Sequence, residues 1–449
     1  MQRRLPPGPP LWESTLNMRR FRENRLEFFS SLYAQYGELC YFQMGPQPIC
    51  LLNAPELIKQ ILVRDYRSFK KGRFLEMAKD LLGEGLLTSG GEHHDRQRRI
   101  IQPLFHRQKI RNYAETMVKR AVLLREQWQA NQEIDMAAEM MRLTLAIVGE
   151  TLFNADVEGE AAELGKAMYT VLETIKMVGN PWALLVRKYQ LNTPGRRRLM
   201  AAQAILDQTI AEIISQHRQG KSNQQDLIAT LLEARDSEGN GEGMSDKQIR
   251  DEALTLFMAG HETTANALAW TWHLLAQHPR VMAGLKQELQ HVIGDRLPDV
   301  EDLSQLRYTR QILTESMRLY PPAWILGRTA LEEYTLNESY YLPQGAVVIM
   351  SQYLVHRDPR WYTQPESFLP ERWSEAFRHS LPKFAYFPFG GGPRNCIGEA
   401  FAWMEGILIL ATLAQKWEAQ AIEAHPVEPE PLVTLRPRYG LKMKLIQSR

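Results

Sequence analysis

Apolar residues recur with helical spacing through the middle of the chain, from about residue 108 to residue 272. Leu143, Ile147 and Leu152 indicate one apolar helix face in this region. Two short apolar runs, residues 47–52 and 346–350, each follow a turn signal of glycine and proline and are typical of β-strands. The pattern therefore predicts a mainly α chain with a small β portion.

A long helix is predicted from about residue 245 to residue 277. Ser245 and Gln248 match the capping box that begins many helices, and no proline appears before Pro279. The interior of this helix contains the segment AGHETT, residues 259–264. Glycine and two successive threonines are poor residues for a helix interior. A local conflict inside a strong helix is where a functional site is expected.

Polar stretches at residues 220–225 and 236–243 are predicted as loops, and neither is long enough to separate domains. Because no internal repeat is found, a single domain over residues 1–449 is expected, with a proline-rich N-terminal segment at residues 1–12. No run of about 18 apolar residues and no signal-peptide core occurs near the N-terminus. The sequence therefore predicts a soluble, cytoplasmic chain without a membrane anchor.

Composition excludes several classes of protein. Charged residues make up 24% of the 449 positions and the formal net charge is +2, so nothing favours nucleic-acid binding. The cysteines are Cys40, Cys50 and Cys396, too few for a disulfide framework and consistent with a reducing compartment.

Cys396 lies in the most informative window of the sequence, FGGGPRNCIG at residues 389–398. A lone cysteine is usually an inert, buried thiol. Here glycines permit turns with positive φ, and backbone N–H groups can point at the sulfur and stabilise its thiolate. Five positions of this window match the pattern F-x-x-G-x-R-x-C-x-G, which makes a chance match improbable.

With this window the chain resembles the cytochrome P450 family, whose heme iron is held by a cysteine thiolate. The segments AGHETT, ESMR at 315–318 and PERW at 370–373 follow the family's motifs in the family's order. The resemblance implies the mainly α cytochrome P450 fold in one triangular, prism-shaped domain. It also implies heme b as the cofactor and Cys396 as the metal ligand.

Further roles follow from the resemblance, residue by residue. Thr263 takes the role of the oxygen-activating threonine, with its hydroxyl bent onto a carbonyl one turn back, and Glu262 takes that of the acid. Gly260 would give oxygen room. The residues implied to contact heme are Phe389, Arg394, Arg328, Arg98 and His94, the last standing where many relatives have tryptophan. A buried structural network is implied for Glu315, Arg318 and Arg372, although E-x-x-R alone is usually an exposed ion pair.

The segments that line the family's distal pocket supply mostly apolar side chains. They predict a sizeable apolar substrate such as a fatty acid, a terpenoid or a retinoid-like molecule. The same side chains could equally belong to the core. The predicted pocket residues are Phe74, Leu86, Leu87, Phe257, Met258, Ala323, Trp324 and Ile325.

Electrons are expected from a separate ferredoxin or flavodoxin with its reductase, because only about 53 residues follow Cys396. The predicted function is therefore a monomeric monooxygenase that uses O₂. A basic stretch near the cysteine could receive an acidic donor or could be an ordinary solvated face. It comprises Arg96, Arg99, Arg107, Lys109 and Arg111, with Lys383 before the cysteine loop. The alternatives are a peroxide-driven or rearranging heme-thiolate enzyme and a non-enzymatic heme sensor or ligand-binding protein.

Overall fold

The computed structural model describes residues 4–106, 111–153, 191–219, 227–236 and 241–448, together with residues 167, 170, 171 and 174. The chain divides into two compact units. The first, called here the β-rich unit, comprises Met1–Glu76 and Thr314–Cys396. The second, called the helical unit, comprises Met77–Leu313 and Ile397–Arg449.

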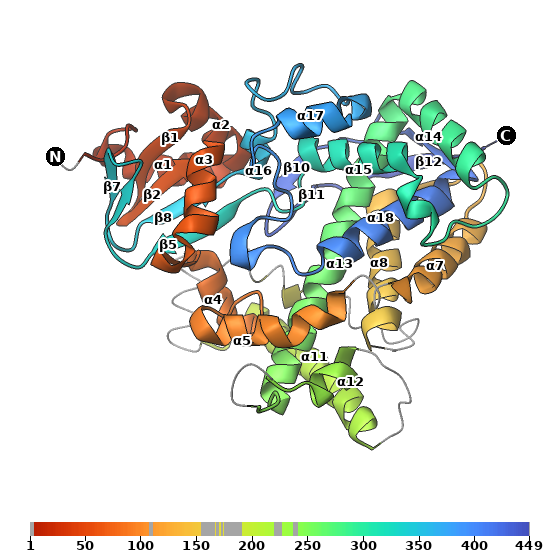
Figure 1. Cartoon of the computed structure of the whole chain (residues 1–449), viewed down its shortest axis with the longest axis horizontal. Helices are drawn as coiled ribbons and strands as arrows, with labels where there is room; N and C mark the ends of the chain where they lie inside the picture. The colour runs from red at the N-terminus through yellow and green to blue at the C-terminus, as the bar shows by residue number, and fades with distance from the viewer. Residues whose placement is uncertain are drawn as a thin grey trace. The chain divides into compact units, whose positions relative to one another are not determined.

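A five-stranded sheet forms the centre of the β-rich unit, with the strand order β1-β2-β8-β5-β3. The strands are β1 (Leu39–Met44), β2 (Gln47–Leu52), β8 (Val347–Met350), β5 (Leu326–Ala330) and β3 (Phe69–Lys71). Strands β2 and β8 are parallel, with Leu52 opposite Met350, and the other pairs are antiparallel. A strand from the start of the sequence and one from its last third thus lie side by side (Figure 1). The two strands predicted from apolar runs are confirmed as β2 and β8.

Short elements surround this sheet. A hairpin is formed by β6 (Tyr334–Leu336) and β7 (Tyr340–Leu342). The α-helices that lie wholly in this unit are α1 (Ser14–Glu23), α2 (Arg25–Tyr36), α3 (Pro55–Lys59), α16 (Gln352–Val355) and α17 (Glu375–Ser380). Single helical turns add η2 (Gln60–Arg64) and η7 (Gly392–Arg394).

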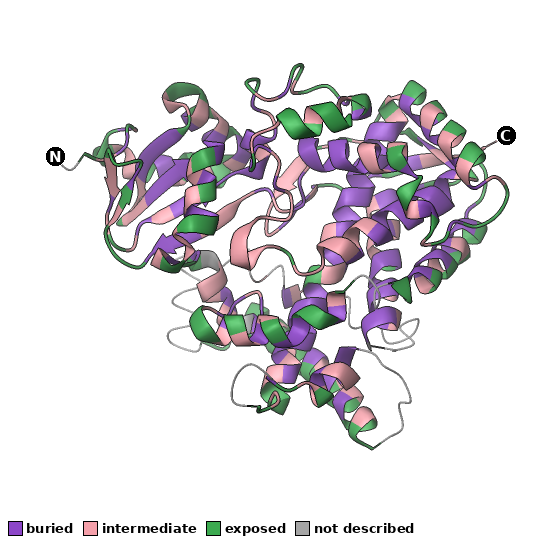
Figure 2. Ribbon diagram, in the orientation of Figure 1, coloured by how far each residue is buried: buried purple, intermediate pink, exposed green. Residues whose placement is uncertain are grey.

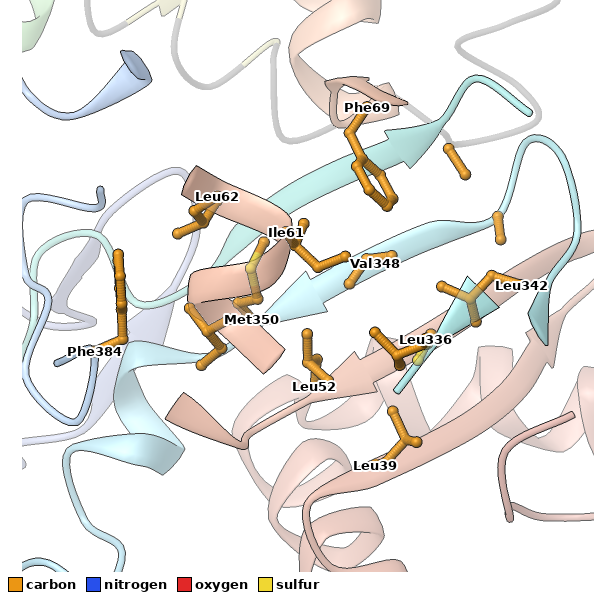
Figure 3. Packing of buried hydrophobic residues seen from close by; sticks show 14 of the residues in the cluster. Leu39, Leu52, Ile61, Leu62, Phe69, Leu336, Leu342, Val348, Met350 and Phe384 are labelled. Carbon is orange, nitrogen blue, oxygen red and sulfur yellow. The ribbon is translucent and has the colours of Figure 1, made fainter. Parts of the chain in front are cut away.

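The core of the β-rich unit lies between the sheet and η2. Val348 and Met350 alternate along β8, so both point to one face, where Ile61 and Leu62 of η2 cover them (Figure 3). Phe384 joins the same cluster next to the cysteine loop. Full burial of each such side chain contributes about 1.5–3 kcal/mol, so this cluster fixes η2 and the loop that packs on it.

The helical unit is built around α13 (Asp246–Gln277), whose 32 residues match the predicted long helix. Its predicted capping box is confirmed: the Gln248 N–H donates to Ser245 Oγ (3.3 Å), and the Ser245 N–H donates to Gln248 Oε1 (2.8 Å). Figure 2 shows this helix almost wholly buried. The elements packed on it include α8 (Met136–Phe153), α11 (Pro194–Arg218), α12 (Leu227–Glu233) and α18 (Glu399–Ala414).

Other helices of this unit are α5 (Gly91–Ile101), α7 (Ala114–Gln127) and α14 (Pro279–Val292), while α4 (Arg73–Leu82) and α15 (Arg307–Leu319) begin in one unit and end in the other. A three-stranded antiparallel sheet joins β4 (Glu133–Asp135), β12 (Lys442–Gln447) and β9 (Trp417–Ala421), and a pair joins β10 (Pro429–Pro431) and β11 (Leu435–Pro437). The predicted mainly α composition with a small β portion is confirmed.

Several sequence predictions can be checked on these elements. Leu143, Ile147 and Leu152 are all buried on α8, as their spacing predicts. Residues 241–243 of the predicted polar loop form neither helix nor strand, whereas the predicted loop at 220–225 lies outside the described residues. None of the described helices combines the length and the hydrophobicity needed to cross a membrane.

Candidate functional site

Cys396 follows η7 and is the exposed cysteine of the chain, with no disulfide. Its N–H donates to the Phe389 carbonyl at 2.9 Å, which closes the loop between the two residues. By contrast, burial raises the pKa of the Cys40 thiol to about 12 and raises that of Cys50 as well. A thiolate ligand must be accessible and must lose its proton easily, so Cys396 is the cysteine suited to bind a metal.

Gly392 shows why this loop needs glycine. Its φ is +70°, and a Cβ at this position would overlap the backbone carbonyl oxygen of Leu62 on η2. Any other residue would therefore be strained and would push the loop away from the core of the β-rich unit.

Arg328 and Arg394 form a pair of neighbouring cations in the β-rich unit. Arg328, on β5, is 7% exposed, and burial together with the charge of Arg394 lowers its pKa to about 10. Within the described part of the chain, Arg328 has no carboxylate partner, and its side chain donates only to its neighbour's carbonyl, Gly327 O (2.9 Å). Arg394 donates to Phe69 O (3.1 Å).

A buried cation is costly unless an anion pairs with it, so among the described residues this arrangement suits a bound anionic group. The propionates of a heme have the required charge, and guanidinium groups bind carboxylates well. Together with the accessible thiol of Cys396, the residues of this unit fit a heme.

His94 and Arg98 lie one turn apart on α5 in the helical unit, as their spacing predicts. His94 is buried, with Nδ1 3.2 Å from Asp95 Oδ1, and Arg98 is half-buried. Their predicted contact with a propionate stays a prediction.

The AGHETT segment contains the residues of α13 that are not buried within an otherwise covered stretch, and these residues are called here the exposed window. From residue 251 to residue 275, every residue is buried except Ala259, Gly260 and Thr263. The Thr263 hydroxyl donates to the Ala259 carbonyl at 2.9 Å, which is the predicted bond to a carbonyl one turn back. The helix continues through this point without a break. A ligand at the exposed window can therefore contact the Ala259 side chain, the Gly260 backbone and the Thr263 hydroxyl.

Gly260 has a packing role that the sequence did not reveal. A Cβ at this position would come within 3.0 Å of Val148 Cγ2 on α8, so glycine allows α8 and α13 to approach closely. Thr144 of α8 also donates to the His261 carbonyl at 3.0 Å, which fixes the two helices at the same point. The predicted role of Gly260 in giving oxygen room stays a prediction.

Glu262 has a hydrogen-bond partner that no sequence motif indicated. The Thr434 hydroxyl donates to Glu262 Oε1 (2.7 Å), and the Asn266 amide donates to the same hydroxyl (3.1 Å). The hydroxyl of Thr263 donates to its own helix, at the Ala259 carbonyl. Thr434 lies 172 residues from Glu262 in the sequence, a separation at which no local pattern operates.

Glu405 on α18 is a buried acidic residue that no sequence motif indicated. It is fully buried, and neither carboxyl oxygen has a hydrogen-bond partner of good geometry among the described residues. Burial raises its pKa to about 8, although the Thr264 hydroxyl beside it acts in the opposite direction. The carboxyl is therefore neutral at pH 7. A single acidic residue inside the apolar run of residues 401–414 was the signal available in the sequence.

The Glu315 carboxylate gathers the residues of the predicted structural network. Arg318 Nε donates to Oε2 (2.8 Å), and Arg372 Nε donates to Oε1 (2.9 Å). Two groups not predicted, the Trp373 indole N–H (2.8 Å) and the Leu369 N–H (3.1 Å), complete its partners. That this network holds the cysteine loop stays a prediction.

The predicted pocket residues are not equivalent. Trp324 is 2% exposed and packs on Phe29 of α2, with ring centroids 6.1 Å apart, so it contributes to the core of the β-rich unit, and its predicted place in the pocket stays a prediction. An indole offers more area to a core than any other side chain, which accounts for this position. The Phe74 side chain lies outside the described residues. Leu86, Phe257 and Met258 are buried, and Leu87, Ala323 and Ile325 are half-buried.

The basic stretch is partly neutralised within the helical unit. Arg96 and Arg99 both pair with Asp236, and Arg111 pairs with Glu301. Arg107 and Lys109 lie outside the described residues. The field that this stretch offers to an acidic donor is accordingly weaker than its sequence predicts.

Comparison with known proteins agrees with this chemistry. The family model Cytochrome P450 matches residues 6–445. The chain is 37% identical to Cyclooctatin synthase of Streptomyces melanosporofaciens, over 96% of this chain and 92% of that protein. It is 35% identical to Cyclooctat-9-en-7-ol 5-monooxygenase of the same species, over 88% and 85% of the two chains.

A third relative is Pentalenene oxygenase of Streptomyces avermitilis, which is 33% identical over 94% of this chain and 92% of its own. These relatives are similar over most of their length, and two of the three names, a monooxygenase and an oxygenase, describe oxygenation. The chain belongs to the cytochrome P450 family, which binds heme b, and it is an oxidoreductase of the monooxygenase type.

Proposed function

We propose that this protein inserts one oxygen atom of O₂ into a terpenoid, by hydroxylation or epoxidation. The observation that supports this choice is the similarity, over 88–96% of this chain, to bacterial relatives that oxidise terpenoids, two of which are named as a monooxygenase and an oxygenase. Of the three substrate classes that the sequence left open, the terpenoid is the one with such support. The mostly apolar residues of the predicted pocket suit a hydrocarbon skeleton held by area burial.

Cys396 is proposed as the proximal ligand. Once bound, heme supplies a thiolate-ligated iron at which O₂ is reduced and one of its atoms is transferred. The loop from Phe389 to Cys396 then holds the sulfur at one place, because its closing hydrogen bond and its contact with η2 leave it little freedom. Arg328 and Arg394 are proposed to bind one propionate, and His94 and Arg98 are proposed to bind propionate oxygen from α5.

Thr263 and Glu262 are proposed to manage protons. The Thr263 hydroxyl donates a hydrogen bond to the Ala259 carbonyl, and rotation about its C–O bond turns the proton away from that carbonyl and toward the exposed window. Glu262 accepts a hydrogen bond from the Thr434 hydroxyl, which holds its carboxyl group in place. A water molecule between the two residues is proposed to complete the relay.

The electron donor is proposed to be a separate ferredoxin or flavodoxin with its reductase. We further propose that the two units act as one heme domain, because a single family model runs through both of them, from residue 6 to residue 445.

A comparative binding titration tests the substrate class. Heme-loaded protein is titrated with terpene hydrocarbons and terpene alcohols, with long-chain fatty acids and with retinoids, and the low-to-high-spin change of the heme spectrum is recorded. We expect the change with terpenoids, followed by oxygenated product when ferredoxin, reductase and NADPH are added. A spin change and product with fatty acids alone would refute the terpenoid assignment and leave the monooxygenase chemistry intact.

A further inference from the structure

Two adjacent carboxylates of α13 hold the loop that follows α4. The Glu84 N–H donates to Asp251 Oδ2 at 2.9 Å, and the Leu86 N–H donates to Glu252 Oε2 at 2.8 Å. Two backbone donors, two residues apart, are thus bound by two consecutive acidic residues. This arrangement is called here the carboxylate clamp.

Glycines let the loop lie directly on the helix. Gly83 has φ +74°, and a Cβ there would overlap the carboxyl group of Asp251. A Cβ on Gly85 would overlap Thr255 Oγ1 and the Asp251 carbonyl. A side chain at either position would therefore lift the loop and break the clamp.

Both acidic residues of the clamp are buried, and the surroundings of Asp251 favour its charged form. Burial alone would raise the pKa of Asp251, but hydrogen bonds from the Glu84 N–H, Arg250 and Lys247 outweigh it, and the net pKa is lowered. Lys247 and Arg250 approach the carboxylate at 2.9 and 2.8 Å. Arg250 also binds Asp207, so the clamp joins the loop to α11 as well as to α13.

The far side of the loop is tied down too. The Thr88 hydroxyl donates to Gly83 O at 2.6 Å, which closes the loop on itself. The Gln97 amide of α5 donates to Glu84 O at 2.7 Å. The loop is therefore held from α13, from α5 and from within, so opening it would break several bonds to buried groups at once.

The clamped loop covers α13 about one helical turn before the exposed window. Thr255, which the loop covers at Gly85, lies four residues before Ala259, and four residues make about one helical turn. Leu86 is buried, while the next residue, Leu87, is half-buried. The clamp thus sets where these two side chains stand next to the window.

We infer that Asp251 and Glu252 are positioning residues that fix Leu86 and Leu87 as a rigid wall of the substrate site and so determine which carbon atom is oxidised. This inference rests on the proposed function, since it assumes that substrate binds over the window. The loop at 83–89 is then a fixed boundary of the site, and substrate does not enter by displacing it.

The test compares two variants that act from opposite sides of the contact. Glu252→Leu removes the acceptor of the Leu86 N–H, and Gly85→Ala pushes the loop away from Thr255. Glu252→Gln keeps an oxygen acceptor and serves as the conservative control. Asp246→Asn, an exposed position at the start of the same helix, controls for general effects on α13. All variants are studied as heme-loaded protein whose CO-bound spectrum matches that of the wild type.

The first readout is backbone hydrogen exchange over residues 83–89. Loss of one buried hydrogen bond should speed exchange about tenfold in Glu252→Leu and in Gly85→Ala, and the double variant should be no faster than the single ones. Both controls should exchange as the wild type does. Unchanged exchange in both single variants would overturn the clamp itself.

The second readout tests whether the loop forms a wall of the site, and its azole measurement does not depend on the identity of the substrate. Affinities for imidazole and for the bulky clotrimazole are measured from the heme spectrum, and terpenoid products are analysed by regiochemistry. We expect the ratio of the two affinities to shift about tenfold, in line with the lost bond, and the products to spread over more positions. Faster exchange with an unchanged azole ratio would overturn the role as a wall. Failure of terpenoids to bind the wild type would instead refute the proposed function.

Discussion

Replacing Glu405 by glutamine should make the protein more stable at alkaline pH. The carboxyl group is fully buried on α18, and neither of its oxygens has a hydrogen-bond partner of good geometry among the described residues. Its pKa is raised from the ordinary 4.5 to about 8. The folded state therefore keeps a proton that the unfolded state loses, and stability falls as pH rises from 4.5 through 8.

The size of this effect follows from the same pKa values. The full difference corresponds to about 5 kcal/mol at one pKa unit per 1.36 kcal/mol. About 3 kcal/mol of this loss in the free energy of unfolding falls between pH 6 and pH 9, the range of the proposed measurement. Glutamine has nearly the same shape as the neutral acid and does not ionise, so the variant should lack this dependence.

The assay is urea unfolding of heme-loaded wild type and Glu405→Gln at pH 6, 7, 8 and 9, followed by far-UV circular dichroism and by the heme absorbance. The free energy of unfolding of the variant should exceed that of the wild type by a margin that grows by about 3 kcal/mol over this range. In thermal melts, an unfolding entropy of about 0.9 kcal/mol/K for 449 residues translates this into about 3 °C. Glu399→Gln, at a half-exposed position of the same helix, is the control and should show a constant margin.

A margin that did not change between pH 6 and pH 9 would refute this reasoning. It would mean that the Glu405 carboxyl is solvated or paired in the folded protein and that burial does not set its protonation.

Three further outcomes are expected. Cys396→Ser should lose the strongly red-shifted band of the reduced, CO-bound protein, whereas Cys50→Ala should keep it; retention of the band in the serine variant would rule out Cys396 as the ligand. Thr263→Ala should bind heme and substrate but divert electrons to hydrogen peroxide, while Thr271→Ala, buried in the same helix, should not; unchanged coupling of NADPH use to product in Thr263→Ala would disprove the proton role. Arg318→Met, which leaves the buried Glu315 short of a partner, should lower the free energy of unfolding by about 3–5 kcal/mol in urea titrations, and a loss below about 1 kcal/mol would contradict the network.

Local chemistry was the part of the fold and the site that could be predicted from the sequence. The cap of α13 depends on Ser245 and Gln248, which are three residues apart, and the Thr263 bond spans one helical turn. The ion pair between Glu315 and Arg318 likewise lies within one turn. Because helical geometry sets interactions of this kind, the spacing of the residues is enough to name the partners.

Contacts between distant segments could not be predicted in this way. Thr434, a hydrogen-bond partner of Glu262, lies near the C-terminal end of the chain, and only the three-dimensional fold brings it next to Glu262. Trp324 shows the converse difficulty, because an apolar side chain in a plausible position serves a core as readily as a pocket. Gly260 is explained by Val148, a residue of another helix. Each case depends on packing, which sequence spacing does not contain.

The pair formed by Arg328 and Arg394 has a consequence for how the protein matures. A buried guanidinium beside a second cation weakens the β-rich unit, so the proposed pairing of Arg328 with a heme propionate would make the cofactor a stabilising ligand of the fold. Such a ligand shifts the folding equilibrium by RT ln(1 + [L]/Kd), which makes the yield of folded chain depend on the heme supply of the cell. Cells starved of heme should accumulate a protease-sensitive apoprotein, and substituting Arg328 by a neutral residue of similar size should reduce that sensitivity while weakening heme retention.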